Sequence, residues 1–201
     1  EFCNQTIFVS MIDKSLFEDE EFSKQDYSSK TISGNEYEYC QFLDCNFSGA
    51  DLSNCKFIEC SFKGCNLSTT KMQNTALQDA NFESCKIIGV DFSSCNDFLL
   101  AFSFVGCQLD YSIFHNKRIV KTKFKDCKIQ EADFTQADLK ESSFSNCNLA
   151  DTVFYNTNLE KVDFRSSENY SIDPTINRIK KARFDIPAVV GLLDQYDIRI
   201  D

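Results

Sequence analysis

Cysteines are the residues of this chain with the most chemistry to offer, because thiolates bind metals, attack electrophiles and form disulfides. The chain has 11 cysteines in 201 residues, and six of them recur every 20 residues with one step of 22: Cys45, Cys65, Cys85, Cys107, Cys127 and Cys147. The other parts of a catalytic site are missing, since the one histidine, His115, has no ordered nucleophile beside it and there is no glycine-rich phosphate loop. We therefore expect no enzyme activity, no catalytic residue, no cofactor and no metal site.

The cysteines belong to a repeat of five residues that runs through most of the chain. Between Cys40 and Phe82 each block of five reads small residue, any residue, a large apolar residue, usually Phe or Leu, then two more residues that are mostly polar. A period of five fits neither a helix at 3.6 residues per turn nor a strand at 2.0. Internal repeats decide the fold, so the elements that position the cysteines must themselves recur every five residues.

The repeat resembles that of the pentapeptide-repeat family, whose formula is A-(D/N)-L-x-x. The best matches are ADLSN at 50–54, ANFES at 80–84, ADFTQ at 132–136 and ADLKE at 137–141. The resemblance implies an all-β fold, a right-handed quadrilateral β-helix in which four five-residue faces make one coil. It also implies that the central large residue and the small residue two before it point inward.

With one coil per 20 residues, inward side chains stack in columns, and two columns form the expected core ladder. These are the phenylalanines and the recurring cysteines: Phe42, Phe62, Phe82, Phe104, Phe124, Phe144 and Phe164, with Cys45, Cys65, Cys85, Cys107, Cys127 and Cys147. Stacked coils lie about 4.8 Å apart with parallel Cβ vectors, which suits a disulfide badly. We expect free thiols that pack as small apolar groups.

The repeat divides the chain into three parts. Residues 1–16 are irregular and are expected to cap the tube, residues 17–166 form the β-helix, and residues 167–201 form a capping and dimerisation segment. Solenoids need such caps because each open end exposes core.

The repeat is interrupted near 97–103 and resumes two residues late at Phe104. The next central residue would be Asp97, which is costly to bury unpaired. We therefore expect a two-residue bulge on one face, in which one of the apolar residues Phe98, Leu99 or Leu100 replaces Asp97 inside the tube.

Charge is unevenly spread along the chain, whose net charge is −10. Residues 1–100 carry 16 acids and 7 bases, whereas residues 101–201 carry 15 acids and 14 bases. Nucleic-acid affinity depends on Lys and Arg at phosphates, so we expect no direct binding of nucleic acid. We predict an acidic partner-binding face on the column centred on Phe17, Tyr37, Phe57 and Leu77, made of Glu18, Asp19, Glu36, Glu38, Glu59 and Asp79.

Basic residues gather between Lys117 and Lys128, and Lys117 falls on an inward position that is normally small. The group is either a solvated patch or a partner contact, and its other members are His115, Arg118, Lys121, Lys123, Lys125 and Lys128, with Asp126 opposing.

The C-terminal tail is more apolar than capping requires. Pro187 suits the first turn of a helix, so we expect a short α-helix over 188–195. Exposed apolar ends mark interfaces, and the predicted dimer interface is Val189, Val190, Leu192, Leu193, Tyr196, Ile198 and Ile200. The tail resembles the C-terminal cap of the quinolone-resistance (Qnr) proteins, which joins two solenoids end to end.

In the Qnr proteins the dimer mimics the size and charge of B-form DNA and engages type II topoisomerase. The resemblance implies a homodimer that binds DNA gyrase and could confer fluoroquinolone resistance. The alternative is a pentapeptide-repeat module that binds a different protein. No window resembles a signal peptide or a membrane span, so we expect a cytoplasmic protein without membrane contact.

Overall fold

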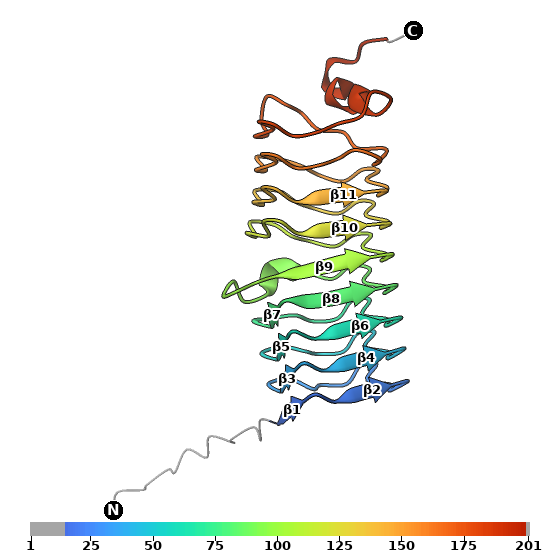
Figure 1. Cartoon of the computed structure of the whole chain (residues 1–201), viewed down its shortest axis with the longest axis vertical. Coiled ribbons are helices and arrows are strands. Elements are labelled where there is room, and N and C mark those ends of the chain that lie inside the picture. Colours follow the sequence, from blue (N-terminus) through green and yellow to red (C-terminus); the bar gives the residue numbers. More distant parts are fainter. Residues whose placement is uncertain (1–14, 200–201) are drawn as a thin grey trace, which may run out of the picture.

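The computed structural model describes residues 15–199 and shows a tube of stacked coils (Figure 1). Its strands are β1 (Leu16–Glu18), β2 (Glu21–Ser23), β3 (Glu36–Glu38), β4 (Gln41–Leu43), β5 (Lys56–Ile58), β6 (Ser61–Lys63), β7 (Ala76–Gln78), β8 (Ala80–Glu83), β9 (Phe102–Val105), β10 (Lys123–Lys125) and β11 (Ser143–Ser145). Three short 3-10 helices complete the secondary structure: η1 (Phe92–Ser94), η2 (Val189–Leu192) and η3 (Asp194–Tyr196).

All strand pairs are parallel and form two sheets, in the orders β1-β3-β5-β7 and β11-β10-β9-β8-β6-β4-β2. Paired residues such as Phe22 and Phe42 lie one coil of 20 residues apart. The pairing of Phe82 with Phe104 in β8 and β9 is the exception, because this coil holds two more residues. The predicted all-β parallel solenoid is confirmed.

Each coil has four walls, numbered in chain order by their central inward residues. The central residues of the first four coils are Phe17, Tyr37, Phe57 and Leu77 on the first wall, Phe22, Phe42, Phe62 and Phe82 on the second, Tyr27, Phe47, Leu67 and Ile87 on the third, and Ile32, Leu52, Met72 and Phe92 on the fourth. The first two walls pair as strands in these coils. The other two pair through isolated bridges and close in turns, as where the Ala50 N–H donates to the Phe47 carbonyl at 2.9 Å.

Aromatic rings fill the middle of the tube. On the second wall they stack nearly parallel from Phe22 to Phe184, with ring centres 4.7 Å apart between Phe42 and Phe62 and 4.6 Å apart between Phe124 and Phe144. Rings on neighbouring walls meet edge to face, an arrangement that the ring quadrupoles favour. From Phe22 to Phe184 the core is therefore continuous along the axis, and rings occupy the place of a central channel.

The bulge agrees with the prediction only in part. Phe98 and Leu99 are not inside the tube but are 70% and 63% exposed, on a loop that projects beyond the outline of the coils between β8 and β9 (Figure 1). Leu100 alone of the three packs against the core. The space is filled instead by Phe102, a large ring at an inward position that is small in other coils, which contacts Phe92 with ring centres 5.5 Å apart.

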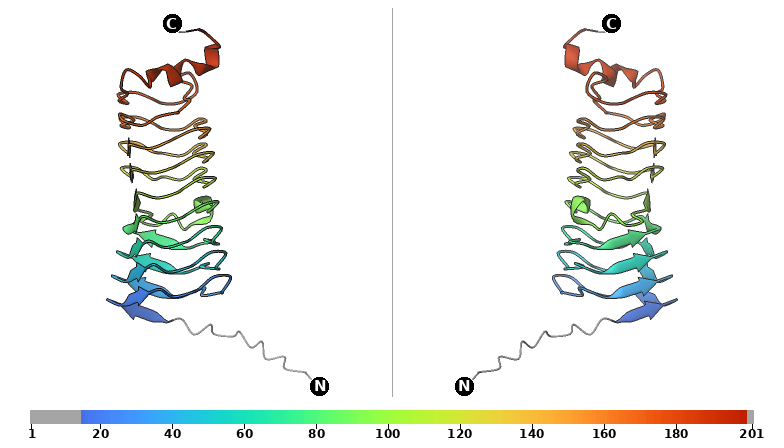
Figure 2. Two further views of the ribbon diagram at one scale, coloured as in Figure 1. Left: turned by 90° about the vertical axis from the view of Figure 1, so that its right-hand side faces the viewer. Right: turned by 90° about the vertical axis from the view of Figure 1, so that its left-hand side faces the viewer.

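The C-terminal segment lies across the last coil and covers that end of the tube (Figure 2). The predicted α-helix over 188–195 is wrong, because the segment forms the 3-10 helices η2 and η3. Val189, Val190 and Gly191 have low helix propensity, and Ala188 supplies no side-chain cap. Across residues 15–199 no helix is long and apolar enough to cross a membrane.

Part of the prediction falls outside the described chain. Only Ser15 and Leu16 of the predicted N-terminal cap are described, and Ile200 of the predicted dimer interface lies outside the described residues.

Candidate functional site

The predicted acidic residues lie together on the first wall, along the sheet β1-β3-β5-β7. Register places Glu18 beside Glu38 and Glu36 beside Lys56. Asp19, Glu59 and Asp79 occupy the corner that follows each strand, and all three are exposed. We call these residues, Glu18, Asp19, Glu36, Glu38, Glu59 and Asp79, the acidic wall.

The corner position aligns three of these carboxylates along the axis and exposes them, with Tyr39 at the same corner of the coil between Asp19 and Glu59. Asp19, Glu59 and Asp79 have φ values of 55, 50 and 54°, a left-handed conformation that turns the chain into the next wall. The Glu59 N–H donates to the Gln78 carbonyl at 2.8 Å, so the backbone is tied to the next coil and the side chain is left in solvent. Carboxylates at this corner lie one or more coils apart and repel one another weakly in water.

One member of the acidic wall is neutralised. Lys56 Nζ lies 3.1 Å from Glu36 Oε1, and the Glu36 side chain is largely buried. The negative potential of the wall therefore comes chiefly from Glu18, Glu38 and the corner row.

The basic residues between Lys117 and Lys128 do not form one patch. Arg118 and Lys121 lie on the first wall, Lys123 and Lys125 in β10 on the second, and Lys128 on the third. Several have acidic partners: Arg118 with Asp138 at 3.8 Å, Lys121 with Glu141 at 4.0 Å, Lys125 with Asp126 at 3.9 Å and Lys128 with Asp110 at 3.1 Å. The arrangement favours a solvated, charge-compensated surface.

Lys117 is directed into the tube. Its side chain is 6% exposed, and its ammonium donates to the Cys95 carbonyl at 2.7 Å and to Asp97 Oδ1 at 2.6 Å. A buried ammonium requires such compensation. Lys117 thus fixes the base of the loop that carries Phe98 and Leu99. The only sign of this role in the sequence was a lysine at an inward position that is normally small.

The thiols of residues 15–199 lie inside the tube, away from solvent. The ten cysteines of the described chain are free and buried, including all six of the predicted column. Burial raises the pKa of the Cys60 thiol to about 12 and that of Cys55 to about 11, so the nucleophilic thiolate is disfavoured. Within residues 15–199 no group of three or more His, Cys, Asp or Glu is arranged to hold a metal ion.

The C-terminal end presents apolar side chains to solvent. Of the predicted dimer interface, Leu192 is half-buried against the core, and the other described members are exposed: Val189, Val190, Leu193, Tyr196 and Ile198. Gly191 allows this segment to approach closely, because a Cβ there would lie 2.0 Å from the Tyr170 carbonyl oxygen. The Ile172 N–H then donates to the Gly191 carbonyl at 2.9 Å.

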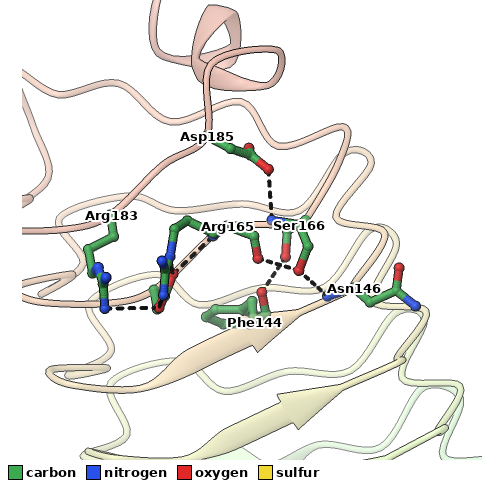
Figure 3. Close-up of polar contacts among 8 residues, drawn as sticks. Phe144, Asn146, Arg165, Ser166, Arg183 and Asp185 are labelled. Carbon is green, nitrogen blue, oxygen red and sulfur yellow. Dashed lines mark hydrogen bonds and ion pairs between the residues drawn. The ribbon is translucent and has the colours of Figure 1, made fainter.

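Polar contacts fasten this end to the last coils (Figure 3). Asp185 Oδ2 accepts from the Ser166 N–H at 2.9 Å. Asp163 lies between two guanidinium groups, with Arg165 at 2.7 Å and Arg183 at 3.5 Å. The apolar surface is therefore held in a defined position on the tube.

Together these features define a β-solenoid of five-residue steps with a filled core, whose walls and end are available for contacts with other macromolecules. A family model described as "Pentapeptide repeat region" matches residues 35–114 and 117–185, and the chain belongs to the pentapeptide-repeat family, as its sequence predicted.

Several solved structures are similar to this chain. A trypsin-treated variant of QnrB1, described as a plasmid-mediated fluoroquinolone resistance protein, matches with a TM-score of 0.61 and 19% identity, covering 94% of this chain and 100% of that chain. Full-length QnrB1 matches with a TM-score of 0.49 and 18% identity, covering 91% and 100%. HetL of Nostoc sp. strain PCC 7120, involved in heterocyst differentiation regulation, matches with a TM-score of 0.37 and 13% identity, covering 85% and 90%. No curated protein sequence matches this chain.

Proposed function

We propose that the protein is a non-catalytic interaction protein that presents its acidic wall to a type II topoisomerase, DNA gyrase, as a mimic of DNA. The observation that carries the proposal is the row of exposed carboxylates at Asp19, Glu59 and Asp79, which one repeated backbone conformation holds along the axis. The likeness of the fold to QnrB1, itself a fluoroquinolone resistance protein, supports the choice of partner.

The physical warrant is electrostatic. Protein grooves that bind DNA are positive, and their field steers an acidic rod toward the same surface. The rod is rigid because its core is continuous, so little ordering entropy is lost on binding. A homodimer joined through the apolar C-terminal end would carry two acidic walls, one toward each tip.

The test is a gyrase supercoiling assay with and without a fluoroquinolone. We expect the protein to relieve drug inhibition at micromolar concentration, or to inhibit supercoiling by itself, and the effect to fall steeply with salt. Replacing Glu38, Glu59 and Asp79 by Lys should abolish the effect without unfolding the tube, because these side chains point outward.

The matched control carries the same change in charge elsewhere. Asp126, Glu131 and Asp151 are exposed corner residues with positive φ on the second and third walls, and their replacement by Lys should leave the effect unchanged. If both triple variants lose the effect on gyrase equally, the effect depends on the net charge of the protein and not on the acidic wall. No effect of the parent protein on gyrase would refute the proposal and favour a different protein partner.

A further inference from the structure

The loop that follows Asp97 exposes two apolar side chains that the fold does not need there. Phe98 and Leu99 are 70% and 63% exposed. Leu99 has a φ of 55°, and no other Ala, Val, Ile, Leu or Met among the described residues has a positive φ. Polar turn formers such as Asn adopt this conformation more easily and are better solvated. Folding alone therefore does not account for Leu99.

A hollow of about 450 Å³ lies beside this loop on the first wall. Its apolar lining comes from Ile58, Leu100 and Val120, with Leu99 at one side. It exists because the sheet of the first wall ends at β7, and the next coil leaves the wall to form the loop. Pairing on this wall resumes only above it, between Arg118 and Asp138.

The rim of this hollow is charged, and Glu59 and Asp79 both line it. Within the described residues neither carboxylate forms an ion pair. A second hollow of about 300 Å³ adjoins the first, shares Asp79, Ala101 and Val120 with it, and reaches Lys121 and Lys123. The residues that line the first hollow include both carboxylates and no cation, so the charge of the hollow itself is negative.

We propose that this hollow, the loop pocket, docks a short segment of a partner protein that carries a large apolar side chain beside lysine or arginine. The apolar side chain fills the space between Ile58, Leu100 and Val120 and is covered by Leu99. The neighbouring cation of the partner meets Glu59 and Asp79. Apolar anchors in small pockets with a charged rim are a common mode of recognition.

The probe is a short fluorescein-labelled peptide with one leucine between two Arg-Lys pairs, measured by fluorescence anisotropy. We expect a dissociation constant on the order of 100 µM or below, with amide shifts in ¹⁵N spectra centred on Leu99, Ala101 and Val120. A matched peptide with serine in place of leucine, and one with Asp-Glu pairs in place of Arg-Lys, should each bind at least about ten-fold more weakly.

Two variants locate the site on the protein. Leu99→Asn should fold as stably as the parent, because Asn suits a positive φ, but should weaken binding about ten-fold. Glu59→Gln with Asp79→Asn should weaken binding of the basic peptide and leave the serine peptide as weak as before. The control is Tyr111→Asn, an exposed residue with a φ of 62° on the third wall, which should bind normally.

Four results would overturn the proposal. Equal binding by parent and Leu99→Asn would place the peptide elsewhere. Equal binding of the leucine and serine peptides would mean charge attraction without an apolar pocket, and tighter binding of the acidic peptide would assign the contact to Lys121 and Lys123. If light scattering gives Leu99→Asn a lower molar mass than the parent protein, the loop is a contact between copies of this chain. Because peptides replace gyrase throughout, a negative supercoiling assay leaves this test unaffected.

Discussion

Cys65 donates its S–H to the Phe42 carbonyl, 23 residues earlier, at a sulfur–oxygen distance of 3.3 Å. Hydroxyls at equivalent positions do the same, as Thr70 Oγ1 donates to the Phe47 carbonyl at 2.9 Å. The sequence predicted that the small inward residues act as apolar filler. The structure adds that Cys, Ser and Thr suit the position because each can also donate a hydrogen bond between coils.

Replacement of Cys65 by threonine and by valine separates the effect of the hydrogen-bond donor from the effect of side-chain volume, because threonine and valine have the same shape. We expect Cys65→Thr to be close to the parent in stability and Cys65→Val to be less stable than Cys65→Thr by about 0.5–1.5 kcal/mol, the net value of one hydrogen bond. Urea unfolding under reducing conditions measures both. Equal stability of the two variants would show that only volume matters at this position.

At the scale of elements, the loop and the C-terminal segment depart most from the repeat, and both depend on single unusual residues. Lys117 holds the loop by its two hydrogen bonds at the base. Gly191 lets η2 lie directly against Tyr170. At both places the regular hydrogen bonding between coils is interrupted, and these contacts hold the chain in position instead.

Gly191→Ala tests the close approach of η2. The added methyl would meet backbone at Tyr170, which cannot move without disturbing the last coil, so we expect a loss of about 1–3 kcal/mol and earlier tryptic cleavage after Lys181 or Arg183. Gly89→Asn is the control, since its φ of 66° suits Asn and its nearest neighbour, Thr69 Cγ2, is 3.7 Å from the new Cβ. A melting temperature for Gly191→Ala equal to that of the parent would contradict the account.

The elements also differ in how well the sequence predicted them. The five-residue step predicted the parallel solenoid through its resemblance to the pentapeptide-repeat family, and the resemblance is easy to recognise because the two inward residues of each step must fit a filled core. It did not predict the exposure of Phe98 or the filling of the core by Phe102, since a bulge has several ways to place its extra residues. The helix over 188–195 failed because local propensity and contact with Tyr170 outweighed the cue from Pro187.

At the scale of the whole molecule, the two ends of the tube differ. The acidic wall lies toward the N-terminal end, and the exposed apolar residues of η2 and η3 lie at the other. Association through the apolar end would keep both acidic walls free, whereas association through the acidic ends would bring like charges together.

We therefore predict a homodimer joined at the C-terminal end. Val190→Asp with Leu193→Asp should give a folded monomer in light scattering, because both side chains are exposed and contribute little to the tube. Deletion of residues 187–201 should also give a monomer or an aggregate. Ile113→Asp with Val153→Asp removes equally exposed apolar groups from the fourth wall and should remain dimeric. A parent protein that is monomeric at micromolar concentrations would contradict the prediction.

The nearly constant number of residues between bonded coils, 20 in most and 22 at the loop, also determines how the tube can assemble. Backbone bonds such as that from Asn66 to the Cys45 carbonyl span 21 residues, and the bond from Cys65 to Phe42 spans 23. The entropy of closing a loop depends on its length, so every coil costs about the same to add, wherever it lies. The chain never has to bring its two ends together, and each coil can form on the one before it while the rest is still being synthesised.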